Sequence, residues 1–187
     1  MRLMGLFAGA FTASSLVVFA TASAIGQLAV RTVPAELRVA GVLAALLASM
    51  VVDGYTIRRK TWCPATPNRQ TPKMIYYRHG ARRAALAWGL DTGLVVTTYR
   101  VSSMSWALLL LGLMGVTPWW IGLAYSAGFV VPLWIGCSTS GIWAGDNTAV
   151  ARLLTGRQSI GRSLCIGASA LSFIIVILNI LPQTAAA

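Results

Sequence analysis

Long apolar runs separated by short polar links dominate the pattern along the chain. The first run, from Leu3 to Val30, contains no charged residue, and a helix needs roughly 20 apolar residues to cross the hydrocarbon core of a bilayer. Later runs are interrupted by glycine, proline or charge. This pattern predicts an all-α, polytopic integral membrane helix bundle, a single domain over residues 1–187, with spans at about 3–30, 39–57, 84–116, 119–137 and 163–181.

A signal peptide is the alternative interpretation of the first run. Arg2, the apolar stretch and the sequence Ala22-Ser23-Ala24 resemble the basic, hydrophobic and cleavage regions of such peptides. The apolar stretch, however, starts directly after Arg2 and continues past the small residues to Val30. We therefore expect a retained transmembrane helix.

The run over residues 84–116 carries Asp91 and Arg100 inside an otherwise apolar stretch. An ionisable residue in such a place is costly and usually faces a bundle interior or a wet cavity. Gly89, Gly93 and the hydroxyl residues over 97–105 predict a helix that is interrupted or closely packed beside these charges. One bent or broken span here gives five spans in all, whereas a turn near Arg100 gives six.

The distribution of basic residues favours five spans. The link over residues 58–83 holds eight of the fifteen basic residues and no acidic one, so the positive-inside rule places it in the cytoplasm. Five spans put Arg152, Arg157 and Arg162 on the same side, and six put them on the opposite side. We expect the N-terminus inside and the C-terminus outside, in the cytoplasmic membrane of a bacterium.

The composition also indicates a membrane protein. Hydrophobic residues make up 57% and charged residues 10% of the chain, and its mean hydropathy is +0.72, whereas soluble domains are about 25% charged. The net charge of +11 does not indicate a nucleic-acid partner, because the bases lie in links between apolar runs. Arg58, Arg59 and Lys60 can contact anionic lipid, although a role as a topological anchor is favoured.

The candidate site is a polar path between helices, formed by Asp91, Thr97, Thr98 and Arg100. Asp91 and Arg100 are nine residues apart, which is about 13.5 Å along a continuous helix, so they can meet only if the helix is broken. Otherwise Arg100 can extend to the outer interface. Asp53 ends the second span beside three bases, and we expect it to be an interfacial ion-pair partner.

Catalytic and metal-binding motifs are missing from the sequence. It has one histidine, no Ser-His-Asp set and no glycine-rich loop followed by lysine, so we expect no enzyme activity and no cofactor. Cys63, Cys137 and Cys165 form no C-x-x-C pair and no metal-ligand spacing. They are expected to be packing residues, with thiol redox work by Cys137 and Cys165 as a weaker alternative.

The run from Trp88 to Tyr99, WGLDTGLVVTTY, resembles the start of a helix in the transmembrane electron-carrier family of cytochrome c biogenesis and disulfide-reductase membrane domains. In that family a glycine-spaced opening leads to a Pro-Cys element, whose cysteine carries reducing equivalents across the membrane. This chain has Thr98-Tyr99 in that place and no cysteine in its first span. The resemblance therefore implies a shared fold without the thiol relay.

Two functions follow from these features. The first is transport or transfer across the membrane through the polar path. The alternative is a non-catalytic membrane subunit or assembly factor that docks to a membrane protein partner, indicated by the small size of the chain and by the G-x-x-x-G pairs Gly5/Gly9 and Gly89/Gly93.

Overall fold

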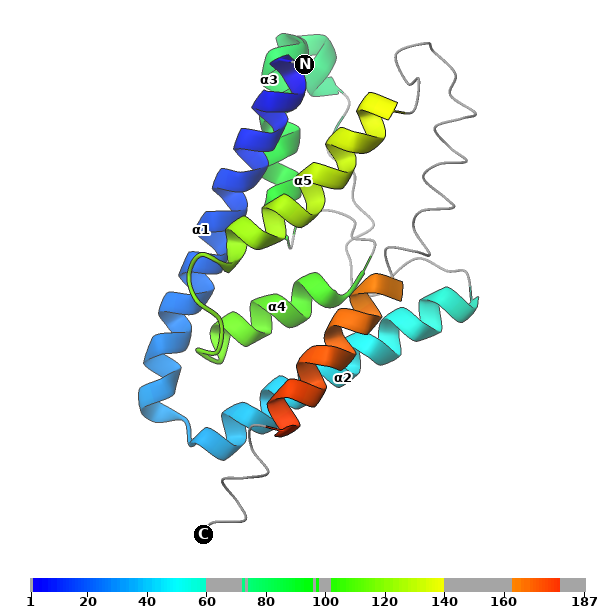
Figure 1. Ribbon diagram of the computed structural model, residues 1–187. Helices are drawn as coiled ribbons and strands as arrows, with labels where there is room; N and C mark the ends of the chain where they lie inside the picture. The colour runs from blue at the N-terminus through cyan, green and yellow to red at the C-terminus, as the bar shows by residue number, and fades with distance from the viewer. Residues whose placement is uncertain are drawn as a thin grey trace.

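The structure is a computed structural model that describes residues 2–59, 72, 74–95, 97, 102–139 and 163–178. Within these ranges the chain is all-α, as the sequence predicts, and contains no strand. Five labelled helices and one further helix make up the fold (Figure 1): α1 (Arg2–Thr32), α2 (Ala35–Arg59), α3 (Met74–Gly93), α4 (Met104–Leu113), α5 (Ile121–Thr139) and the helix Ser163–Leu178, called the last helix below.

Two of these helices, α1 and α2, are long and apolar enough to cross a membrane. The last helix and α4 are apolar but shorter. The region expected to be one span over 84–116 is divided between α3 and α4. The described residues thus form six helices, and the number of spans stays a prediction.

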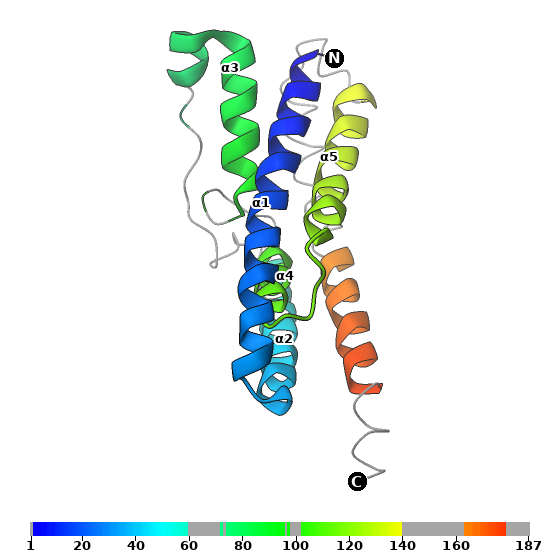
Figure 2. The ribbon, with the colours of Figure 1, turned by 90° about the vertical axis from the view of Figure 1, so that its left-hand side faces the viewer.

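The longest of the described helices, α1, is the element against which α3, α4 and α5 pack. Figure 2 shows α3 and α5 beside its N-terminal half, on different sides, and α4 beside its C-terminal half. Glycine contacts show the same arrangement along α1, because Gly89 of α3 faces Ala10 whereas Gly112 of α4 faces Ala22. The broken segment α3–α4 therefore runs parallel to α1 along its length.

The contact between α1 and α3 is very close because α3 presents glycines to it. A Cβ atom added at Gly89 would lie 2.9 Å from the Ala10 Cβ, and one at Gly93 would lie 2.5 Å from the Phe11 carbonyl oxygen. Small residues allow two helix backbones to approach in this way. The pair Gly89/Gly93 is thus used inside the molecule, while Gly5 and Gly9 have no atom within 4 Å of an added Cβ.

Hydroxyl groups of α1 add interhelical hydrogen bonds to this packing. Thr12 Oγ1 and Ser126 Oγ of α5 are 2.5 Å apart, and Ser23 Oγ donates to the Thr117 carbonyl oxygen at 3.1 Å. In lipid such bonds hold helices together where a hydrophobic driving force is weak. They fix both α5 and the link before it against α1.

Aromatic stacking fills the rest of the α1–α5 contact. The fully buried Phe11 ring stacks on Phe129 with ring centroids 4.5 Å apart, and it also contacts Tyr125 at 5.9 Å. Phe19, also fully buried, contacts Tyr125 at 5.2 Å. These rings form the apolar core of the N-terminal half of α1.

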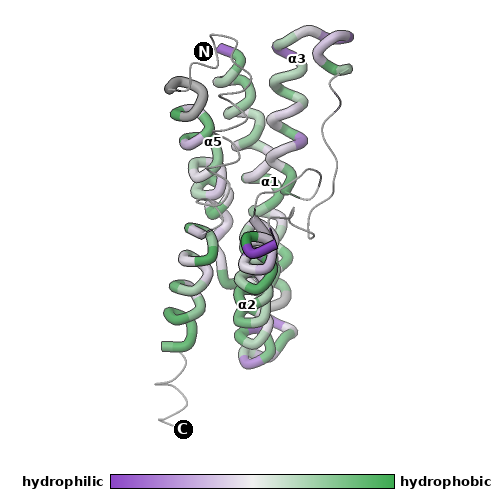
Figure 3. Tube along the Cα trace, turned by 90° about the vertical axis from the view of Figure 1, so that its right-hand side faces the viewer, coloured by the Kyte–Doolittle hydropathy of each residue, from purple (hydrophilic) through white to green (hydrophobic). Residues whose placement is uncertain are grey.

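A separate apolar cluster joins α2, α4 and the last helix. Val42 and Leu46 of α2 pack with Leu111 of α4, and Phe173 and Val176 of the last helix cover them. Figure 3 shows hydrophobic residues along most of α2 and the last helix, with hydrophilic ones mainly near helix ends. This cluster positions the N-terminus of α4 beside the C-terminal part of α2.

Candidate functional site

The break between α3 and α4 begins at Gly93. Ser15 Oγ of α1 donates a hydrogen bond to the Gly93 carbonyl oxygen at 3.3 Å, and Thr97 Oγ1 donates to the Asp91 carbonyl oxygen at 2.5 Å. These bonds satisfy carbonyls that an interrupted helix leaves free, as is required where water is scarce. Both features expected from the sequence here, interruption and close packing, are present.

Val95 gives this break an unusual backbone. Its φ is 59°, in the left-handed region, although it is β-branched and its side chain is fully buried. Such a conformation is rare for a residue of this type and costs on the order of 1–3 kcal/mol. The surrounding packing therefore holds the end of α3 in one defined geometry.

At the other end of the break, Ser102 and Ser103 converge on Asp53 of α2. Ser102 Oγ donates to Asp53 Oδ2 at 2.5 Å, while the backbone N–H and the hydroxyl of Ser103 lie 2.8 and 2.9 Å from Asp53 Oδ1. The Asp53 side chain is only 1% exposed. It is a buried carboxylate bound by hydrogen-bond donors from a segment about fifty residues away in sequence.

Asp53 takes the place of a helix cap for α4. Ser103 is the N-cap residue, yet its side chain makes no capping hydrogen bond. Asp53 accepts the Ser103 N–H instead, and Ser102 Oγ accepts the Met104 N–H at 3.1 Å. The positive end of the α4 dipole also faces the carboxylate.

Other small polar groups surround the carboxylate. The Ser103 hydroxyl is also 3.2 Å from Ser49 Oγ, one turn earlier in α2, and the fully buried Thr56 donates to the Asp53 carbonyl oxygen at 2.9 Å. From the last helix, the free thiol of Cys165 is hydrogen-bonded to Ser102. Three helices thus contribute to one polar cluster, which we call the Asp53 cluster: Ser49, Asp53, Thr56, Ser102, Ser103 and Cys165.

Within the described residues, no lysine or arginine forms an ion pair with Asp53. The expectation of an interfacial ion pair is therefore wrong for Arg58 and Arg59, whereas a pair with Lys60 stays a prediction because Lys60 lies outside the described residues. Val42 and Leu46 pack one side of α2 against Leu111 of α4. Asp53 is buried on the same side of α2, one turn after Ser49, and therefore faces α4. Arg58 and Arg59, by contrast, are exposed.

The residues expected to line the polar path are brought together only in part. Asp91 lies in the last turn of α3, partly exposed and involved in further interactions, and Thr97 contacts its backbone. Thr98 and Arg100 lie outside the described residues, as does Lys60. The path of Asp91, Thr97, Thr98 and Arg100 stays a prediction.

A sequence signal for the Asp53 cluster does exist. Ser102 and Ser103 directly precede the apolar run that begins at Met104, which is the pattern of a helix N-terminus. Sequence alone does not reveal that the acceptor is Asp53, because that depends on how α2 packs against α4. From the hydroxyl run, the sequence pattern places only Thr97 and Thr98 in the path with Asp91.

The geometry of the described residues offers little support for metal binding or thiol redox chemistry. Over the parts of the chain that the structure describes, no group of three or more histidine, cysteine or acidic residues could hold a metal ion. Cys165 is a free thiol. Cys63 lies outside the described residues and the side chain of Cys137 is not described, so the Cys137–Cys165 alternative stays a prediction.

Comparison of the chain with protein-family models, with curated proteins and with solved structures found no match. The resemblance to the transmembrane electron-carrier family therefore stays a prediction.

Proposed function

We propose that the protein is a small membrane transport protein that transfers protons through the Asp53 cluster, at the break between α3 and α4. The observation that carries this proposal is the burial of a carboxylate among apolar helices with only hydroxyl groups and one backbone N–H as its described hydrogen-bond partners. An ionisable residue of this kind in a membrane helix is typical of proton relays and ion pathways.

Placement in a membrane is supported by the surface of α1 and α2. Only 28% of the residues in the most apolar stretch of α1, and 17% of those in α2, are buried inside the molecule. Val17, Leu28, Leu37 and Val51 are each more than 60% exposed. A helix in the core of a soluble protein would bury such residues, so lipid is the environment that suits this surface.

The Ser102 hydroxyl allows the cluster to hold either protonation state of Asp53. When Asp53 is charged, Ser102 Oγ–H donates to Oδ2. When Asp53 is protonated at Oδ2, the carboxyl O–H donates to Ser102 Oγ, because a hydroxyl is both donor and acceptor. The Ser102 hydrogen then turns toward the Cys165 sulfur, its other partner. A proton can therefore be taken up or released without a large movement of heavy atoms.

Asp91 is the candidate second carboxylate of the proposed path. It lies before the break, whereas Ser102 and Ser103 lie after it. In this proposal Asp91 and Thr97 form the entrance on the α3 side, as the sequence pattern predicts, and Asp53 forms the buried station.

A purely structural role for Asp53, as the cap of α4, is the competing explanation, and one substitution separates the two. In Asp53→Asn the amide oxygen can still accept the Ser103 N–H, but the side chain cannot gain or lose a proton. The protein would be reconstituted in vesicles that contain a pH-sensitive dye, and a potassium diffusion potential would drive protons inward. We expect faster acidification than in empty vesicles, and loss of the excess rate in Asp53→Asn.

The same assay applied to Asp91→Asn tests the entrance, with an expected partial or complete loss of the excess rate. Wild-type vesicles that acidify no faster than empty ones would contradict proton transfer. An unchanged rate in Asp53→Asn, with equal protein incorporated, would leave Asp53 as a structural cap only.

The second candidate function is a membrane subunit or assembly factor. It is favoured by the open face at Gly5 and Gly9, where an added Cβ would meet nothing within 4 Å, since small residues with G-x-x-x-G spacing allow close approach of another helix. Purification in mild detergent followed by mass measurement tests it. A stable copurifying protein supports this function, and a stable monomer counts against it.

A further inference from the structure

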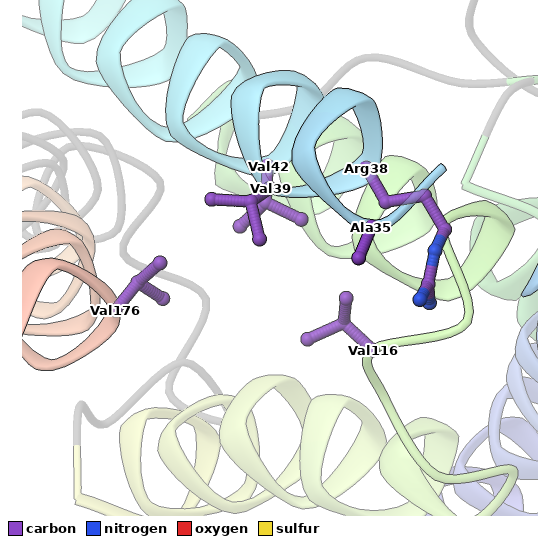
Figure 4. Close-up of a pocket in the computed structure, with 6 residues that line it drawn as sticks. All are labelled: Ala35, Arg38, Val39, Val42, Val116 and Val176. Atoms are coloured by element: carbon purple, nitrogen blue, oxygen red, sulfur yellow. The ribbon is translucent and has the colours of Figure 1, made fainter. Parts of the chain in front are cut away.

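A cavity lies between the N-terminal part of α2, the link after α4 and the last helix, apart from the Asp53 cluster. Its volume is about 130 Å³. Figure 4 shows Val39 and Val42 of α2 on one side, Val116 opposite them, and Val176 and Arg38 at the two ends. Ala35 completes a lining that is apolar apart from Arg38.

Arg38 gives this cavity one charged end. Its Nε atom is buried and has no hydrogen-bond partner within the part of the chain that the structure describes. A buried donor without a partner costs on the order of 1–3 kcal/mol, and more when it is charged. Arg38 also lies in the first turns of α2, where the helix dipole favours a negative charge. The end of the cavity at Arg38 is therefore suited to an anion.

An apolar cavity with a cationic end has the chemistry of an anionic phospholipid site. A cavity of roughly 150 Å³ holds about one benzene ring, so 130 Å³ accommodates only the upper part of one acyl chain. The rest of the chain would continue along the exposed apolar surface of α2, where Leu47 and Val51 are 50% and 62% exposed. A free phosphate ion would leave this apolar lining unused.

We propose that this cavity, the Arg38 cavity, binds one acyl chain of an anionic phospholipid, with the lipid phosphate on the Arg38 guanidinium. Arginine suits this role because its planar fork forms paired, charge-assisted hydrogen bonds to phosphate oxygens. The site is separate from the basic residues at the C-terminal end of α2. These are Arg58 and Arg59 in its last turn, followed in sequence by Lys60. The lipid site does not depend on the proton-transfer proposal.

Lipid retention by the purified protein tests this site. Detergent-solubilised protein would be mixed with phosphatidylglycerol or phosphatidylcholine, and bound lipid would be counted by native mass spectrometry. We expect one retained phosphatidylglycerol and about tenfold weaker retention of phosphatidylcholine. Arg38→Gln should lose about that factor for phosphatidylglycerol, as expected for one charge-assisted contact. The control Arg31→Gln removes an exposed arginine in the last turn of α1 and should retain the lipid.

A second pair of variants tests the apolar part without changing charge. Val116→Phe places a ring in the cavity from an exposed link position, whereas Val131→Phe adds the same ring at an exposed position of α5 outside the lining. Only Val116→Phe should reduce retention. Glycerol phosphate, which lacks acyl chains, should not compete. Equal retention of both lipids, equal loss in both arginine variants, or competition by glycerol phosphate at lipid concentrations would overturn the proposal.

Discussion

The close contact of α1 with α3 predicts a marked difference between two chemically identical substitutions. Gly89 and Gly54 are both helical glycines, and both would be changed to alanine. At Gly89 the new methyl group would lie 2.9 Å from the Ala10 Cβ and closer still to the Phe7 carbonyl oxygen, whereas at Gly54 nothing lies within 4 Å. Only the first substitution forces two helix backbones apart.

The size of the effect follows from these distances. Optimal carbon–carbon separations are about 3.5–4.0 Å, so α1 and α3 must separate by roughly 1 Å, and overpacking of this kind costs about 1–3 kcal/mol. At Gly54 alanine should be neutral or stabilising by up to about 1 kcal/mol, since glycine disfavours helices. With about 2–4 °C per kcal/mol for a domain of this size, Gly89→Ala should lower the melting temperature by roughly 2–12 °C.

Thermal unfolding in detergent, followed by loss of helical circular dichroism, measures both variants against wild type. The packing described for α1 and α3 requires a lower melting temperature for Gly89→Ala and an unchanged or higher one for Gly54→Ala. Equal melting temperatures for the two variants would show that α3 does not approach α1 as closely as the structure indicates.

Three further measurements probe the cap of α4, the aromatic contact of α1 with α5, and the membrane topology. Asp53→Ala, which removes the cap of α4, should destabilise the protein by about 0.5–2 kcal/mol, and Asp53→Asn should destabilise it less; thermal unfolding measures both. Phe11→Ala removes a fully buried ring stacked on Phe129 and should cost about 3–5 kcal/mol, whereas Val17→Ala, at a 63% exposed position, should change the melting temperature little. A reporter fused after Ala187 should be active only if it requires the outer compartment, as five spans and a cytoplasmic N-terminus require; activity of a cytoplasm-dependent reporter would favour six spans.

Several of the helices could be predicted from the sequence because each depends on a local pattern, although α3 begins at Met74, inside the link expected over residues 58–83. The uncharged run from Leu3 to Val30 became α1, and the apolar run that begins at Met104 became α4. The interruption between Gly93 and Met104 could also be predicted, since glycine, charged and hydroxyl residues coincide there. These features depend on neighbouring residues only.

The Asp53 cluster could not be predicted in the same way because its contacts join distant segments. In sequence Asp53 is close to Arg58 and Arg59, and an ion pair with them was the simpler expectation. In the structure the packing of Leu46 against Leu111 turns the same face of α2 toward the N-terminus of α4. Asp53 is therefore bound by hydrogen-bond donors about fifty residues away instead of by its neighbours.

The central claim is that Asp53 takes up a proton inside an apolar environment, and covalent labelling measures this most directly. A lipid-soluble carbodiimide adds to a protonated carboxyl group and rearranges to a stable N-acylurea. The carboxyl proton ends on a nitrogen of the adduct, and one carboxyl oxygen becomes its urea oxygen. Peptide mass mapping of labelled protein in lipid vesicles should find the adduct on Asp53, with proton flux falling in proportion to the labelled fraction. Full inhibition of flux with Asp53 unmodified, or complete modification of Asp53 with flux unchanged, would contradict the account.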